Sequence, residues 1–89
     1  MDVDVDLDSL QKFIQTLDMF QQQMADQMRV MSGAWTACKE TLDGPSAREF
    51  VEQYDQTQSQ VLTAIGTGED ALSQLRKLAH VVTDLHGGR

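Results

Sequence analysis

The residues best suited to chemistry are one cysteine and two histidines, and their spacing forms no catalytic or metal-binding set. Cys38 falls at an inward position of an amphipathic pattern with no histidine near it in sequence, so we interpret it as a buried structural thiol. His80 and His86 would lie on different faces of one helix, with no cysteine to join them in a zinc site. We therefore expect no enzymatic activity, no catalytic residue, no metal and no cofactor.

An acidic start is the other candidate ligand set. Four aspartates alternate with apolar residues over positions 2–8, as at the beginning of a calcium loop. Such a loop needs glycine at its sixth position and glutamate at its twelfth. Counted from the first aspartate, those positions hold Leu7 and Phe13, so the match fails. We interpret residues 1–7 as a solvated acidic arm.

Composition narrows the class of protein. The chain has 89 residues, which predicts one domain over 1–89 with a small core, and its single cysteine allows no internal disulfide. A net charge of −7 without a basic stripe argues against nucleic-acid binding. No apolar run is long enough to insert in a membrane, and no signal peptide is visible. We expect a protein made in the cytoplasm that, if exported, leaves by a leaderless, type VII-like route.

A heptad repeat predicts one amphipathic helix over about residues 8–42, capped by Asp6 or Asp8, with Asp8 and Gln11 at capping-box spacing. The first, fourth and fifth heptad positions are mostly apolar. They hold Leu10, Leu17, Met24, Met31 and Cys38 (first), Phe13, Phe20 and Ala34 (fourth), and Ile14, Met28, Trp35 and Leu42 (fifth), with Gln21, Gln27 and Thr41 as exceptions.

A turn follows at residues 43–45 and reverses the chain. Asp43, Gly44 and Pro45 place a glycine where a helix ends and a proline where it cannot continue. Ser46, with Glu49 three residues on, predicts a capping box that opens a second helix. A connection this short predicts an antiparallel hairpin.

The second helix is predicted over about residues 46–85, followed by a flexible tail at 86–89, and it repeats the heptad pattern. Gly66 and Gly68 interrupt it. Two glycines within three residues favour a kink at 66–68, or a short break with Thr67 recapping the chain. A close helix–helix approach or a hinge is the alternative interpretation.

The predicted fold is therefore all-α: a hairpin of two long helices that pairs into a four-helix bundle dimer. Each helix carries about three apolar positions per heptad, a stripe wider than one neighbouring helix can cover. Exposed apolar patches of that size usually mark interfaces. The expected partner is the chain itself or a related helical hairpin. The predicted interaction residues are Phe13, Leu17, Phe20, Met24, Met28, Met31, Trp35, Phe50 and Tyr54.

The pattern resembles the WXG-100 family of small proteins tied to type VII secretion. Trp35 precedes the turn, and the second helix opens with Ala47-x-x-Phe50 and Tyr54, as in WXG-like members. The resemblance implies a dimer that acts as substrate, co-substrate or chaperone of a type VII-like system, with a secretion-system membrane ATPase as a further partner. Two departures stand out: Trp35-Thr36-Ala37 lacks the family's glycine, and His80 stands where the export signal has tyrosine.

Two alternatives remain. One is a filament subunit resembling a type III secretion needle protein, which would form head-to-tail polymers in place of closed dimers. The other is a WXG-like adaptor that is not secreted.

Overall fold

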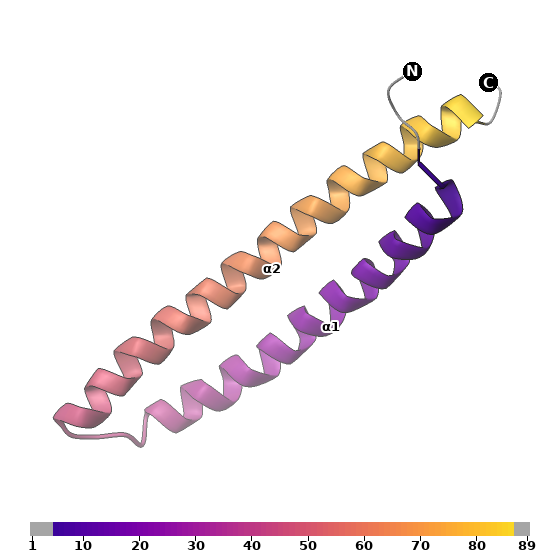
Figure 1. Ribbon diagram of the computed structural model, residues 1–89. Helices are drawn as coiled ribbons and strands as arrows, with labels where there is room; N and C mark the ends of the chain where they lie inside the picture. Colours follow the sequence, from indigo (N-terminus) through magenta and orange to yellow (C-terminus); the bar gives the residue numbers. More distant parts are fainter. Residues whose placement is uncertain (1–4, 87–89) are drawn as a thin grey trace.

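The computed structural model describes residues 5–86, and they form two long helices joined by a short connection (Figure 1). Helix α1 spans Leu7–Lys39 and helix α2 spans Pro45–His86. The two helices pack against each other in an antiparallel hairpin, which confirms the predicted all-α fold. Residues 1–4 of the predicted acidic arm and 87–89 of the predicted tail lie outside the described residues.

Helix α1 begins with Asp6 as its N-cap. One carboxylate oxygen, Oδ1, accepts hydrogen bonds from the backbone N–H groups of Asp8 at 3.0 Å and Ser9 at 3.4 Å. These bonds satisfy two of the amides that a helix start leaves without a partner in the helix. Of the two predicted caps, Asp6 is therefore the one used, and Asp8 lies in the first turn.

Helix α1 ends three residues before the predicted limit of 42. Its C-cap is Glu40, and the Thr41 N–H donates to the carbonyl of Cys38 at 3.0 Å. The prediction that Gly44 ends this helix is wrong, because Gly44 instead directly precedes α2. The connection between the helices therefore covers 40–44.

Helix α2 opens at Pro45. Gly44 has a φ of +96°, in the left-handed region that favours glycine, and its carbonyl accepts from the Arg48 N–H at 3.0 Å. Proline suits the first position of a helix because its fixed φ is already helical and it needs no N–H there. Ser46 therefore lies inside the first turn, and the predicted Ser46–Glu49 capping box does not form.

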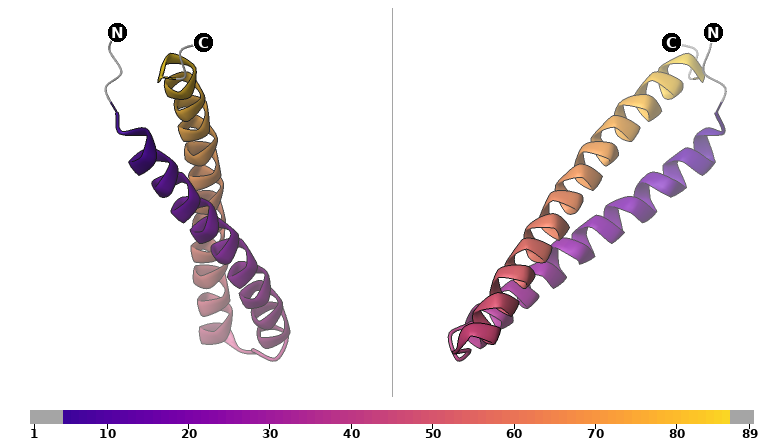
Figure 2. Two further views of the ribbon diagram at one scale, coloured as in Figure 1. Left: turned by 90° about the vertical axis from the view of Figure 1, so that its right-hand side faces the viewer. Right: turned by 60° about the vertical axis from the view of Figure 1, so that its left-hand side comes forward.

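The glycines at 66 and 68 do not interrupt α2. The helix is continuous from Pro45 to His86, and both views in Figure 2 show it running on through this region. The preferred prediction, a kink or a break, is wrong. At Gly68 the Gln21 side chain of α1 lies against the backbone of α2, so the glycine makes room for a side chain.

The hairpin is a pair of crossed rods with a thin core (Figure 2). Its extents are 66 × 21 × 16 Å, so each helix has one helical neighbour along its length. The largest cluster of buried residues, formed by Leu10, Ile14 and Leu72, lies toward the end where the described chain begins and finishes. Little else is enclosed, and much of both apolar stripes stays on the surface.

Candidate protein-interaction face

The fifth heptad positions form the seam between the two helices. On α1 these are Ile14, Gln21 and Met28, all buried, followed by the half-buried Trp35. The first positions flank this seam and are partly buried along most of its length. Within the hairpin each helix therefore covers two of the three apolar positions of its partner.

The fourth positions are left open. An α-helix turns about 100° per residue, so fourth positions lie roughly 100° around from fifth positions. Because the helices are antiparallel, the fourth positions of both turn to the same side of the hairpin. The seventh positions lie beside them and face the same way. We call this surface the open face.

All but one of the side chains at the fourth and seventh positions are exposed, Leu78 being half-buried. The open face consists of Ser9, Phe13, Thr16, Phe20, Gln23, Gln27, Val30, Ala34 and Ala37 of α1, and Ser46, Phe50, Gln53, Thr57, Gln60, Ala64, Thr67, Ala71, Gln74, Leu78, Val81 and Leu85 of α2.

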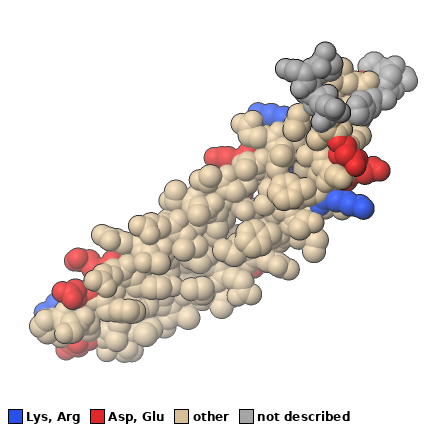
Figure 3. Space-filling model, in the orientation of Figure 1, with Lys and Arg blue, Asp and Glu red and all other residues tan. Residues whose placement is uncertain are grey.

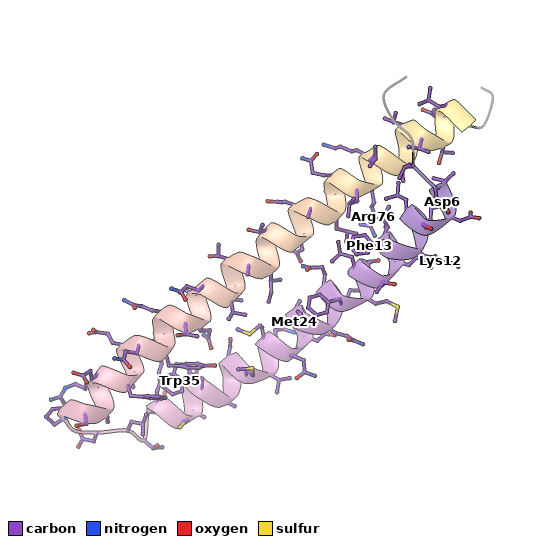
Figure 4. All side chains as sticks on the ribbon, in the orientation of Figure 1. Asp6, Lys12, Phe13, Met24, Trp35 and Arg76 are labelled. Carbon is purple, nitrogen blue, oxygen red and sulfur yellow. The ribbon has the colours of Figure 1, made fainter. Side chains whose placement is uncertain are left out.

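No charged residue of either helix belongs to the open face. Every Asp, Glu, Lys and Arg of α1 and α2 occupies a second, third or sixth heptad position. The face turned to the viewer in Figure 3 is uncharged along most of its middle, and the charges gather toward the two ends and the edge. Figure 4, in the same orientation, labels Phe13 and Met24 along α1. The open face is thus uncharged, and it combines apolar side chains with amides and hydroxyls.

A shallow apolar groove runs across the open face near its centre. Phe20 and Met24 of α1 and Val61 and Ala64 of α2 line it, and it has a volume of about 330 Å³. The groove joins side chains from both helices, which shows directly that their fourth positions share one side. Phe13, Phe20 and Phe50 on this face are 54%, 53% and 53% exposed, respectively. Completing the burial of each would contribute about 1 kcal/mol.

The opposite side of the hairpin is polar. Asp18 of α1 and Arg76 of α2 form an ion pair across it, with an O–N distance of 3.1 Å. Glutamines 11, 15 and 22 of α1 line two of the hollows on this side, together with Glu69 and His80 of α2. A third hollow, between Ala25 and Leu62, is mostly apolar. Charged and amide groups of this kind remain well solvated without a partner, and Leu62 is the large apolar side chain that α2 exposes on this side.

An aromatic cluster closes the hairpin near the connection (Figure 4 labels Trp35). The Trp35 ring lies 4.7 Å from the Tyr54 ring, centroid to centroid, and 5.9 Å edge-on from that of Phe50. Its indole Nε1 donates a 2.8 Å hydrogen bond to Oδ1 of Asp55. The Lys39 ammonium lies 3.4 Å from both carboxylate oxygens of Asp55. The indole N–H of Trp35 therefore already has a hydrogen-bond acceptor within the hairpin.

These contacts favour the ionised form of the Asp55 carboxyl group. The hydrogen bond from Trp35, together with the hydrogen bond and positive charge of Lys39, lowers the pKa of the Asp55 carboxyl, although partial desolvation opposes them. The ionised form is the better acceptor for both donors, so the folded hairpin favours it. The cluster joins α1 to α2 near the connection and stabilises the hairpin, because Trp35 and Lys39 both donate to Asp55 within the chain.

The predicted interaction residues divide between the open face and the hairpin interior. Phe13, Phe20 and Phe50 belong to the open face, and the exposed Met31 borders it. Leu17 and Met24 are half-buried at its inner edge, and Trp35 and Tyr54 are half-buried in the aromatic cluster. Met28 is 5% exposed in the seam, so it packs on α2 and is not available to a partner. The predicted turn residues lie in the connection (Asp43, Gly44) and in the first turn of α2 (Pro45, Ser46).

Cys38 corrects one sequence-based interpretation. It was predicted to be a buried structural thiol, but it is exposed. Met31, at the same heptad position one repeat earlier, is also exposed, so the first positions of α1 turn out of the seam toward the connection end of the hairpin. Cys38 therefore lies beside the open face, next to Ala37 and Ala34.

Three polar residues that matter to the hairpin were missed by the sequence reasoning. Gln21 is 6% exposed, and its Nε2 donates a 2.9 Å hydrogen bond to the backbone carbonyl of Ile65. Gln58 also lies in the seam, and its Oε1 is buried without a hydrogen-bond partner among the described residues. Asp55 accepts from Trp35. Gln21 could have been found from the sequence, because it is a glutamine at a heptad position that is otherwise apolar. No feature of the sequence pointed to Asp55.

Two further findings concern the described residues alone. Within residues 5–86 no group of three His, Cys, Asp or Glu side chains lies close enough together to hold a metal ion. Neither α1 nor α2, over the part of the chain that the structure covers, contains a segment long and apolar enough to cross a membrane.

Comparison with known proteins adds no relative: no protein-family model, no curated protein and no solved structure matches the chain significantly. The resemblance to the WXG-100 family therefore stays a prediction from the pattern and residues of this sequence.

Proposed function

We propose that the chain is a non-catalytic protein-interaction module whose open face packs against another helical hairpin to complete a four-helix bundle. The observation that carries the proposal is the open face itself, which is uncharged, continuous over both helices and the site of most of the large apolar side chains left exposed. Of the ten large hydrophobic side chains left exposed within the described part of the chain, seven lie on this face or border it, Val30 and Leu85 among them. Concentration of exposed apolar groups on one side is typical of an interface.

The shape of the face favours helices as the partner. It is a long strip formed by two adjacent rods (Figure 1), with large phenylalanine side chains at some positions and small alanine and threonine side chains at others. Another pair of helices offers ridges and grooves of the same spacing, and four-helix bundles are assembled in this way. A catalytic pocket would need polar groups converging in a concave site, whereas the groove at Phe20 and Ala64 is almost wholly apolar.

The biological role that we propose follows the family resemblance: a WXG-100-like substrate, co-substrate or chaperone of a type VII-like secretion system. The long antiparallel hairpin and the aromatic cluster around Trp35 near its connection support this role. The test is export of a tagged chain from cells with and without the membrane ATPase of such a system. ATPase-dependent export supports the role, and equal retention in both strains contradicts it.

The interaction itself is tested with neighbouring substitutions. Phe20 lies on the open face, and Met19 is a large, exposed residue on the outer side of α1. Light scattering and analytical ultracentrifugation measure association of the full chain, alone and mixed with candidate hairpin proteins. We expect Phe20→Ser to abolish association and Met19→Ser to leave it intact. Equal effects of the two variants would contradict the proposal, and filaments in electron micrographs would favour the needle-like alternative.

A further inference from the structure

The hairpin exposes far more surface than a compact protein of its mass. Its accessible area is 6759 Å², whereas a folded monomer of 9.9 kDa is expected to expose about 5,200 Å². Its radius of gyration is 19.7 Å, against about 12 Å for a compact domain of this length. The excess area is about 1,500 Å² per chain, which is the amount that each subunit of an obligate dimer typically buries.

The core of a single hairpin is correspondingly small. Among the residues that the structure describes, six are buried, and Val82 is the largest side chain that is fully enclosed. Small proteins whose core contributes little stability commonly add disulfides, a metal or oligomerisation. A disulfide within the chain is excluded by its single cysteine. Association is the remaining route that the structure itself offers, through the open face.

The polar groups on the open face suit a second copy of the chain as its occupant. They are amides and hydroxyls, such as Thr16, Gln27, Thr57 and Gln60. Amides and hydroxyls both donate and accept hydrogen bonds, so two identical faces can satisfy each other. Carboxylates only accept and ammonium groups only donate, so a charged face would require a different, complementary partner. The open face is therefore chemically suited to a copy of itself.

The net charge of −7 opposes self-association, but the charged groups of the helices lie away from the open face. The charged side chains of the helices lie at second, third and sixth positions, away from the open face. Exposed charges more than about 10 Å apart are largely screened at physiological salt. Added salt should therefore strengthen pairing, whereas it would weaken a complex held by opposite charges.

We propose that the occupant of the open face is a second copy of this chain, and that this pairing is what keeps the hairpin folded. The inference rests on the proposed function, because it names the partner of the same face. It goes beyond that function by predicting an obligate homodimer in which folding and association are one process.

Unfolding followed by circular dichroism at several protein concentrations tests the coupling. When a dimer unfolds to two separate chains, the midpoint temperature rises with concentration. For a chain of this length the rise is about 8 °C over a roughly hundredfold increase. Light scattering on the same samples is expected to give twice the 9.9 kDa chain mass.

Isosteric charge substitutions locate the interface. The double variant Gln27→Glu, Gln60→Glu places two carboxylates on the open face, and the matched control Gln15→Glu, Gln56→Glu adds the same charge on exposed positions outside it. Burying unpaired carboxylates is costly, so we expect the first variant to weaken association about a hundredfold or more at neutral pH. Association should recover, relative to the control, as the pH falls below the glutamate pKa of about 4.3.

The outcomes separate this inference from the proposed function. A 9.9-kDa monomer whose unfolding midpoint is independent of concentration overturns the second-copy inference, and leaves the open face to a different hairpin. A homodimer that is equally stable with either pair of substitutions overturns both, because association would then use another surface. A dimer weakened only by Gln27→Glu, Gln60→Glu supports both.

Discussion

The Gln21 side chain occupies the space that a Cβ atom at residue 68 would need. A methyl group built on Gly68 would lie 2.7 Å from Cδ and 2.9 Å from Nε2 of Gln21, both too short for real contacts. The absence of a side chain at Gly68 lets the amide reach the backbone of α2 and donate to the carbonyl of Ile65. One residue pair thus fixes the axial register of the two helices near the middle of the hairpin.

Gly68→Ala and Gly66→Ala form a matched pair that tests this contact. A Cβ at Gly66 would meet nothing within 4 Å, so alanine there should stabilise the helix by up to about 1 kcal/mol. At position 68 the same gain is outweighed by displacement of the buried Gln21, and we expect a net loss of about 1 kcal/mol. Urea unfolding of both variants measures the difference. If both substitutions stabilise the chain, the Gln21 side chain can move away from position 68 without loss of folding free energy.

Gln58 should be a point of weakness in the seam. Its Oε1 is buried without a hydrogen-bond partner among the described residues, and such an acceptor costs about 1–3 kcal/mol. Gln58→Met keeps the length of the side chain and removes the polar group, so the free energy of unfolding should rise by about 1 kcal/mol or more. Gln56→Met, at an exposed position, is the control and should change little.

The Asp55 carboxylate should make stability depend on acid pH. Its pKa is lowered in the folded chain, so its contribution is fully present above the unfolded value of about 3.9 and is lost as the pH falls through the folded value. Asp55→Asn should be less stable than the parent chain at pH 7, with the gap closing in strong acid. Thermal unfolding of both chains across this range tests the sign. A gap that stays constant with pH would show that the charge of Asp55 plays no part.

Cys38 offers a probe that needs no substitution. It is exposed in the single hairpin and lies beside the open face. A second copy on that face should slow its reaction with thiol reagents, because the sulfur would lose access to solvent. We expect the labelling rate to fall as protein concentration rises. The dissociated Gln27→Glu, Gln60→Glu variant should label fast at every concentration, and a parent chain that labels equally fast would argue against coverage near Cys38.

Much of the fold was predictable because its signals are local. The heptad period of the apolar residues predicts a helix wherever it is sustained, and Gly44-Pro45 prevents α1 and α2 from merging into one rod. The helix ends were predicted less well. Lys39 ends α1 early and Pro45 starts α2, since the backbone of the connection decides these boundaries and several residues there could cap a helix.

The candidate site was predictable as a list of residues but not as a surface. The stripe of three apolar positions per heptad correctly identified Phe13, Phe20 and Phe50 as apolar side chains that one neighbouring helix leaves exposed. It did not separate them from Met28, which belongs to the same stripe and is buried inside the hairpin. Periodicity gives the width of a stripe, but not which part of it a neighbour covers.

The sequence by itself determined two amphipathic helices, their antiparallel pairing and a stripe too wide for one neighbour. Only the tertiary structure decided that the fifth positions close the hairpin and the fourth positions stay open. A wide stripe can pack along either of its edges, and contacts between distant residues select one. Here the fit of Gln21 against Gly68 and the bond from Trp35 to Asp55 hold the helices in the orientation that leaves an uncharged face on one side.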